Sequence, residues 1–207
     1  MVPRVNKQAM ADILLILAEF YKYPDENFYQ ELVSGALCLE LQHLMQAVGF
    51  VLECPLGNLA VGGLEDLKME YVKSFIGTGR PAAVPVESVY KVWTTDKSAK
   101  ISIAGQKGYL MGDSALHMAY LLNSMGFEVP EEFRSMPDHL CLMLELLAYM
   151  IKDCSSQDVC LYLQEHFHWL EDFEQRLIEI GGSEFYLQAT KLLRQCVKRT
   201  AELLTQT

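Results

Sequence analysis

The residues of this sequence best suited to chemistry are Asp138 and His139, an adjacent carboxyl and imidazole that precede a long apolar run. The run predicts a helix over residues 135–151 that is buried on most of its circumference. Ser135 is expected to cap this helix through an Asp variant of the capping box, with Pro137 in the first turn. An Asp–His pair at the N-terminal end of a hydrophobic helix is therefore the first candidate for a functional site.

A further ionisable residue of the same helix is Glu145, which follows Asp138 by seven positions and is expected on the same helical stripe. Residue types alone leave two interpretations open. In the structural one, Asp138 only caps the helix, where the dipole favours a negative charge, and His139 is a hydrogen-bonded residue of the helix start. The other is a binding site. Residue chemistry by itself favours the structural interpretation.

The sequence carries no motif for an enzyme with a bound nucleotide or metal. The P-loop pattern is absent, and its nearest approach, Gly105-Gln-Lys-Gly108, is too short. His-Glu-x-x-His is also absent, and the imidazoles of His166 and His168 would point about 200° apart on a helix, which suits one metal poorly. Glu165, His166 and His168 are expected on an exposed helix face. We predict no resident cofactor and no metal site.

The composition is that of an acidic protein of 207 residues, with a net charge of −10 and a pI near 4.9. This length suits one domain, 1–207, with a substantial core. The acidic balance argues against binding to nucleic acid, which needs clustered Lys and Arg. Six cysteines without a Cys-x-x-Cys pair are typical of a reducing compartment. Without a secretory signal or the roughly 18 uncharged residues of a membrane span, we predict a cytoplasmic protein with no stable membrane insertion.

Helical periodicity predicts an all-α fold of about eight helices, at residues 7–22, 24–33, 37–51, 64–76, 109–125, 135–151, 157–180 and 184–204. Glycines and prolines interrupt the pattern from residue 77 to residue 108, which predicts a long irregular hinge loop. A further loop is expected at Cys54–Gly57 and Gly62–Gly63. A strand pattern competes only at Ala99–Ala104.

A series of short motifs runs through the chain from about residue 10 to residue 204. They are Phe75-Ile-Gly77, Pro85-Val-Glu-Ser-Val-Tyr90, Tyr109-Leu-Met-Gly112, Gly126-Phe127, Pro137-Asp-His-Leu140, Tyr162-Leu-Gln-Glu-His166-Phe-His-Trp169 and Glu184-Phe-Tyr186. In order and spacing they resemble the TorD/DmsD/NarJ family, the cytoplasmic chaperones of molybdoenzyme maturation. The chain departs from the family pattern at Met143, where Glu is frequent, and in a longer loop between Tyr90 and Tyr109.

The resemblance implies a chaperone without catalytic activity. Its expected partner is the apo form of a molybdopterin oxidoreductase of the DMSO, TMAO or nitrate reductase type, together with the twin-arginine signal peptide of that enzyme. The chaperone would hold this client for cofactor insertion before export or assembly. The resemblance implies either a monomer or a domain-swapped homodimer, and the hinge loop permits both.

The same resemblance assigns candidate binding residues. Those for the signal peptide or client are Glu87, Ser88, Tyr90, Pro137, Asp138, His139, Leu140 and Glu145. Those for an apolar groove are Phe75, Pro85, Trp93, Met118 and Met143. Carboxylates beside apolar side chains suit a peptide in which an Arg pair precedes an apolar segment. Plain core packing is the alternative for each apolar residue, and Ser88 and Glu145 can be purely structural.

Two other classes of function stay open. One is a non-catalytic assembly subunit of a redox enzyme complex, which would remain bound to its partner through purification. The other, less favoured, is a nucleotide-binding enzyme, for which no residue pattern is present. Release of the client once it matures would distinguish the chaperone from the subunit.

Overall fold

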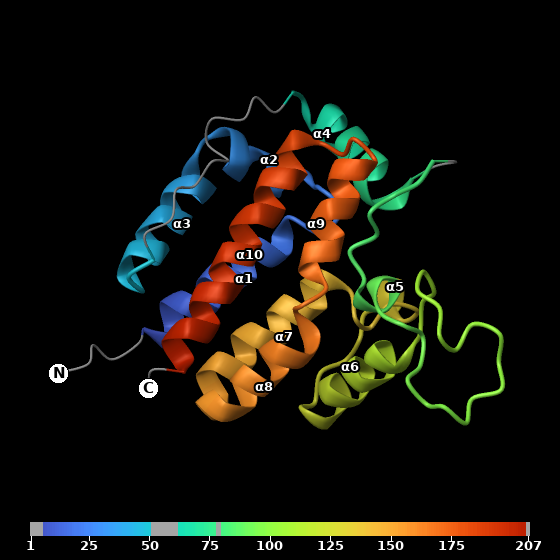
Figure 1. The fold of residues 1–207 in the computed structure, drawn as a ribbon. Coiled ribbons are helices and arrows are strands. Elements are labelled where there is room, and N and C mark those ends of the chain that lie inside the picture. Colours follow the sequence, from blue (N-terminus) through green and yellow to red (C-terminus); the bar gives the residue numbers. More distant parts are fainter. Residues whose placement is uncertain (1–5, 51–61, 78–79, 206–207) are drawn as a thin grey trace.

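The computed structural model describes residues 6–50, 62–77 and 80–205, which form an all-helical fold (Figure 1). The α-helices of these residues are α1 (Lys7–Glu19), α2 (Glu26–Val33), α3 (Ala36–Ala47), α4 (Leu64–Tyr71), α5 (Glu87–Tyr90), α6 (Asp113–Ser124), α7 (Leu140–Asp153), α8 (Ser156–His166), α9 (Leu170–Glu179) and α10 (Glu184–Leu204). A π-helical turn, η2 (Val72–Ile76), continues α4, and a 3-10 turn, η3 (Glu131–Phe133), precedes α7. Extended pairing within the described ranges is limited to one bridge, Val86 with His139. The predicted all-α class is confirmed.

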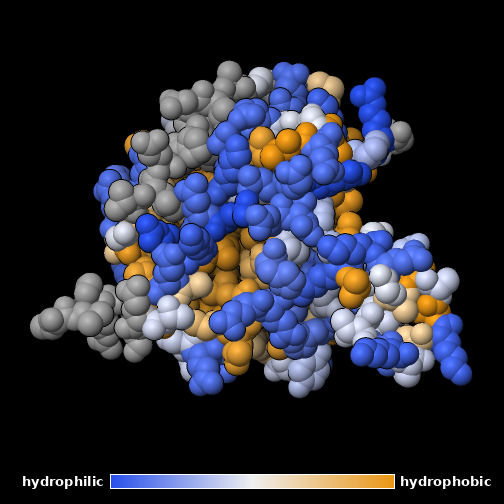
Figure 2. All heavy atoms as spheres, viewed as in Figure 1, coloured by the Kyte–Doolittle hydropathy of each residue, from blue (hydrophilic) through white to orange (hydrophobic). Residues whose placement is uncertain are grey.

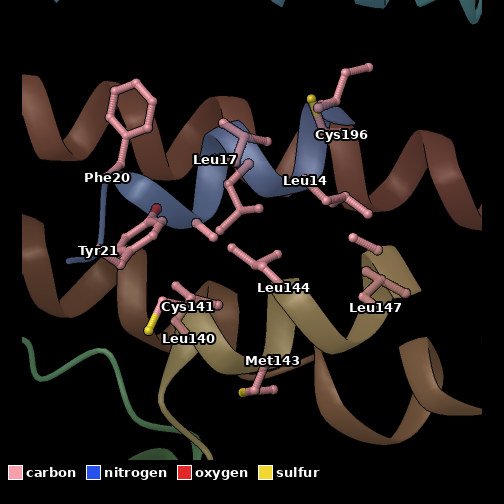
Figure 3. Packing of buried hydrophobic residues seen from close by; sticks show 14 of the residues in the cluster. Leu14, Leu17, Phe20, Tyr21, Leu140, Cys141, Met143, Leu144, Leu147 and Cys196 are labelled. Carbon is pink, nitrogen blue, oxygen red and sulfur yellow. The ribbon is translucent and has the colours of Figure 1, made fainter. Parts of the chain in front are cut away.

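The core is built around α7, which makes its most extensive contact with α1. Figure 3 shows Leu14 and Leu17 of α1 facing Leu144 of α7, and each of these side chains is at most 1% exposed. Met143 points away from α1, on the opposite side of α7. Because full burial of one leucine side chain contributes about 1.5–3 kcal/mol, this interface is a principal source of stability.

A cluster of aromatic rings joins η2 to α9 and α10. The Phe75 ring lies 4.7 Å from the Tyr186 ring and 6.0 Å from the Phe173 ring, measured between centroids. Tyr71 contacts Phe75 edge to face at 5.1 Å. Such pairs contribute about 0.5–1.5 kcal/mol beyond the area they bury. The cluster fixes the end of η2, and with it the point from which the chain continues toward α5.

The start of α7 differs from the prediction. Ser135 lies in a turn, and the helix begins at Leu140 with His139 as its N-cap. The reason is a long-range contact, because the backbone N–H of Leu140 donates to the carbonyl oxygen of Pro85 at 2.9 Å. Pro137 therefore precedes the helix instead of occupying its first turn.

The single helix predicted for residues 157–180 is wrong, because the structure divides it into α8 and α9. The division falls at Phe167–Trp169, where the indole N–H of Trp169 donates to the carbonyl oxygen of His166 at 2.8 Å. Both helices bury apolar side chains, so the periodicity does not reveal the turn. The other helices occur where predicted, with ends shifted by a few residues. The loop expected at Cys54–Gly57 lies outside the described residues.

The irregular segment predicted after residue 77 is present where it is described, and it contains the short helix α5. Beyond α5 the chain doubles back, since Trp93 N–H donates to Gln106 O and Thr94 N–H to Ala104 O, both at 2.9 Å. Residues 99–104 form turns and bends and no strand. In Figure 1 this segment projects from the helical body beside α6.

The projecting loop returns to α6 through a close approach at Gly112. A Cβ atom on Gly112 would lie 2.6 Å from the carbonyl oxygen of Trp93, which accepts a hydrogen bond from Asp113 N–H. We expect Gly112→Ala to lower the free energy of unfolding by about 1–2 kcal/mol, measured by chemical denaturation. Gly105→Ala is the control, because nothing lies within 4 Å of its added Cβ. Equal stability of the two variants would contradict the close approach.

The surface in Figure 2 is mostly polar over α9 and α10, with apolar surface in the hollow beside α10. That hollow is lined from α8, α9 and α10, by residues that include Leu163, Phe167, Leu170, Val197 and Ala201. Among the described helices none has the length and apolar character needed to cross a bilayer.

Candidate functional site

Two motifs that are 50 residues apart in the sequence meet at the start of α7. Ser88 N–H donates to the Asp138 carboxylate at 2.6 Å, and Glu87 N–H donates to the Asp138 carbonyl at 3.2 Å. Val86 and His139 form the antiparallel bridge beside these bonds. We call these residues the Glu87–Asp138 junction. It brings together Glu87, Ser88, Asp138 and His139, four of the candidate binding residues.

Asp138 is fully buried in this junction. Burial raises the pKa of its carboxyl, although the hydrogen bonds from Ser88 oppose the shift. One carboxylate oxygen, Oδ2, accepts the Ser88 N–H, and Oδ1 has no hydrogen-bond partner among the described residues. Because Asp138 precedes α7, it shares no helical stripe with Glu145, contrary to the prediction. Its position is that of a residue that holds two segments together.

His139 is also buried, and burial lowers its pKa to about 4. Its Nδ1 accepts the N–H of Cys141 as the cap of α7 and lies 3.0 Å from the Cys141 sulfur. Burial raises the pKa of that thiol to about 12. A nucleophilic cysteine needs a thiolate beside a protonated imidazole, and both shifts here favour the neutral forms. The geometry is therefore that of a helix cap.

Glu87 is fully buried, and its two carboxylate oxygens have different partners. Oε1 lies 2.6 Å from Lys91 Nζ, and Oε2 lies 2.8 Å from Nδ1 of His166. The other ring nitrogen of His166, Nε2, lies 3.0 Å from Nδ1 of His117. The exposed helix face predicted for His166 is wrong, since this side chain is 1% exposed. Lys91 thus supplies an opposite charge to the buried carboxylate, and His166 supplies a hydrogen-bond partner.

Most of the apolar residues predicted for a groove pack inside the protein. Those that are buried are Phe75, Pro85, Met118, Leu140 and Met143, together with Pro137 and the ring of Tyr90. The Tyr90 ring stacks on Trp169, with centroids 5.2 Å apart, and burial raises the pKa of its hydroxyl. Trp93 is partly exposed, and its indole N–H donates to Leu110 O at 3.2 Å.

Glu145 lies apart from the junction. Its carboxylate forms an ion pair with Lys22 at 2.7 Å, and its side chain is 38% exposed. Lys22 also pairs with Glu19 at 2.7 Å. Of the three carboxylates predicted to bind the client, Glu87 and Asp138 lie together, and Glu145 lies on a different, accessible surface.

Two cavities border the junction. The first, of about 500 Å³, we call the histidine cavity; it is lined by Tyr90, Lys91, Val92, Thr95, Lys107, Asp113, Ser114, His117, Glu165, His166, His168, Trp169 and Asp172. The second, of about 600 Å³, we call the carboxylate groove; it is lined by Lys22, Tyr23, Tyr71, Ile76, Pro130, Glu132, Phe133, Leu142 and Glu145. The Phe133 ring lies 4.7 Å from the His139 ring, so the junction contacts one wall of the groove.

Residue patterns did not single out several members of these cavities. Tyr23 and Ile76 are large apolar residues that the periodicity places beside helix ends, yet each is 55% exposed in the carboxylate groove. Glu132 lies in none of the motifs and in none of the predicted helices. His117 lies on α6, 49 residues before His166, and no local motif joins the two.

The arrangement of the helices matches that of a solved helical protein. A crystal structure of a proposed redox enzyme maturation protein from Archaeoglobus fulgidus superposes with a TM-score of 0.56, over 96% of this chain and 97% of that one. At 19% identity this likeness shows the fold alone.

The sequence profile of the family described as "Nitrate reductase delta subunit" matches residues 34–180. The match covers most of the chain, which therefore belongs to this family. The resemblance to TorD/DmsD/NarJ proteins found in the motifs is confirmed.

Two curated relatives carry the name "Chaperone protein TorD". The protein from Shewanella piezotolerans is 25% identical over 208 residues, which covers 97% of this chain and 94% of the relative. The protein from Shewanella pealeana is 26% identical over 142 residues, which covers 68% of this chain and 62% of the relative, less than two thirds of its length.

Proposed function

We propose that this protein is a cytoplasmic maturation chaperone that holds an apo molybdoenzyme by its twin-arginine signal peptide until the cofactor is inserted. Family membership and the name of the TorD relatives support the chaperone role. The observation that carries the peptide-binding role is the carboxylate groove, which combines apolar walls with two accessible carboxylates.

The walls of the groove suit the apolar part of a signal peptide. Tyr23 and Ile76 are each 55% exposed, whereas the groove residues inferred from the resemblance are mostly buried. Phe133 and Leu142 complete the apolar surface. A peptide that covered these side chains would remove exposed apolar area from water, which favours binding by about 25 cal/mol for each Å².

The carboxylates of the groove suit the two arginines. Glu145 is paired with Lys22 at 2.7 Å, and such half-exposed pairs contribute only about 0–1 kcal/mol. An arginine can replace Lys22 at Glu145, because its planar guanidinium binds a carboxylate in two places and a lysine ammonium does not. Lys22 would retain Glu19 as a partner. Glu132, which is exposed on η3, is the second acceptor.

The Glu87–Asp138 junction has a supporting role in this proposal. His139 contacts Phe133, and Leu140 is tied to Pro85, so the junction holds the segment before α7 as one wall of the groove. Glu87 and Asp138 are fully buried and need not contact the peptide. In this proposal the family motif Pro-Asp-His-Leu affects binding indirectly, because it holds one wall of the groove in position.

Calorimetry with a twin-arginine peptide from a molybdoenzyme of the host tests the proposal. We expect Glu145→Gln and Glu132→Gln each to weaken binding roughly tenfold, which corresponds to about 1.4 kcal/mol, and to reduce its dependence on salt. The fold should tolerate both changes, because both side chains reach solvent.

Glu40→Gln is the matched control, since it removes one exposed carboxylate on α3 away from the groove. A Lys-Lys version of the peptide should bind more weakly than the Arg-Arg version to the wild-type protein. Equal binding of the two peptides, or unchanged binding by both groove variants, would contradict the proposed contact. A client that stays bound after cofactor insertion would support the assembly-subunit alternative instead.

A further inference from the structure

We propose that His117, Glu165 and His166 form a binding site for one divalent transition-metal ion of the zinc type, at the edge of the histidine cavity. The site is separate from the carboxylate groove and does not depend on the signal-peptide proposal. It also reverses the prediction, made from local motifs, that the protein has no metal site.

The ligand atoms of these residues are already close together. Nε2 of His166 lies 3.0 Å from Nδ1 of His117, and that Nδ1 lies 3.4 Å from Oε1 of Glu165. All three ligand atoms lie within 4.8 Å of one another. A tetrahedral zinc ion with bonds of about 2.0–2.1 Å would separate its ligands by roughly 3.3 Å. Two of the three edges are close to this value, and the exposed Glu165 carboxylate would rotate to shorten the third on binding.

The buried carboxylate of Glu87 orients the site. Its Oε2 lies 2.8 Å from Nδ1 of His166 and, as a carboxylate oxygen, accepts a hydrogen bond from that nitrogen. The other ring nitrogen, Nε2, is then the one available to a metal ion, and it faces His117. Metal-binding histidines in proteins almost always donate their second ring N–H in this way, commonly to a carboxylate. Glu87 is thus a positioning residue.

The histidine cavity would let a metal ion reach the site and would leave one of its coordination positions open. The side chains of His117 and Glu165 are 38% and 59% exposed, and both line the histidine cavity, so an ion can enter from solvent. Two imidazoles and one carboxylate are the ligand set of zinc sites that keep a fourth position open. That position would face the cavity. Because His117 lies on α6 and the other ligands on α8, the ion would join these helices.

The test uses the full-length protein, stripped of metal with a chelator. We expect calorimetry with Zn²⁺ to show one site, and Co²⁺ to give visible d–d absorption without the near-ultraviolet thiolate charge-transfer band of a cysteine site. His117→Gln and Glu165→Gln should each weaken Zn²⁺ binding by at least tenfold. Both residues reach the surface, so the variants should fold, as circular dichroism would verify.

His43→Gln is the matched control, because it removes an exposed imidazole on α3 that is remote in sequence from the site. Binding by this variant should equal that of the wild type. Long-range ¹H–¹⁵N spectra should show shifts at Nδ1 of His117 and Nε2 of His166 on addition of Zn²⁺. Absence of Zn²⁺ binding to the wild type overturns the proposal. Binding that persists in His117→Gln, or that carries a thiolate band, also overturns it.

Discussion

Asp138→Ala is expected to lower the free energy of unfolding by about 2–3 kcal/mol, whereas Asp138→Asn should cost less than about 1 kcal/mol. Alanine removes the oxygen that accepts Ser88 N–H and leaves a buried donor without a partner. It also leaves a cavity beside the fully buried Glu87. Asparagine keeps the acceptor and removes the cost of burying a carboxyl group. Urea denaturation followed by circular dichroism at neutral pH measures both values.

The direction of the pKa shift adds a second test of Asp138. Burial raises the pKa of its carboxyl above the ordinary value of 3.8. The folded state therefore favours the protonated form, and the stability from this preference is present below pH 3.8 and is lost as the pH rises through the raised value. The stability of Asp138→Asn relative to the wild type should therefore increase as the pH rises through that range. Asp153→Ala, which removes an exposed carboxylate of α7, is the control and should change stability by less than about 0.5 kcal/mol. Similar losses for Asp138→Ala and Asp153→Ala would contradict the buried bond.

Acidification should destabilise the wild type through His139. Burial lowers the pKa of this imidazole from 6.5 to about 4. A lowered histidine pKa contributes stability that is fully present above pH 6.5 and is lost as the pH falls through about 4. A pKa difference of this size between the unfolded and folded states corresponds to roughly 3 kcal/mol of unfolding free energy. Unfolding free energies measured at intervals from pH 7.5 down to pH 4 would follow the loss.

The contribution of His139 is isolated by comparison with His139→Gln, which cannot titrate. The pH dependence of stability contributed by the neighbouring Asp138 has the opposite sign, because its raised pKa favours the folded state in acid. The Cys141 thiol stays neutral throughout this range. Both remain in the variant, so the difference between the two proteins reports the imidazole. We expect the stability of His139→Gln to fall less steeply with acid than that of the wild type. Parallel curves would show that His139 is solvated in the folded state. His43→Gln, at an exposed position, should follow the wild type.

The helices could be predicted from the sequence because each buries a periodic apolar face. The course of α10 from Glu184 to Leu204 follows this pattern closely. The errors fell where a distant contact decides a local structure. Pro85 O determines where α7 begins, and the indole of Trp169 closes the end of α8. Neither contact leaves a signal in the local spacing of apolar residues.

The candidate site could be predicted only in part, again because distant contacts decide its structure. The two motifs of the Glu87–Asp138 junction could be read from the sequence, and the structure brings them together. The burial of the charged residues in these motifs could not be predicted, because a charged residue is ordinarily expected at the surface. The pairing of His117 with His166 depends on how α6 packs beside α8, which no spacing along the chain encodes. The exposure of Ile76 likewise depends on where η2 ends.

The packing of α1 on α7 has a consequence for synthesis on the ribosome. Leu14 and Leu17 are made early, but Leu144, which faces them, follows more than a hundred residues later. Helix α3 also packs on α1 and is made early, but the face of α1 that contacts α7 stays uncovered until α7 has left the exit tunnel. Contacts between such distant segments slow folding and leave apolar surface exposed to association. Nascent chains that end before α7 should therefore depend on holding factors of the cell, whereas chains that extend through α10 can close their own core.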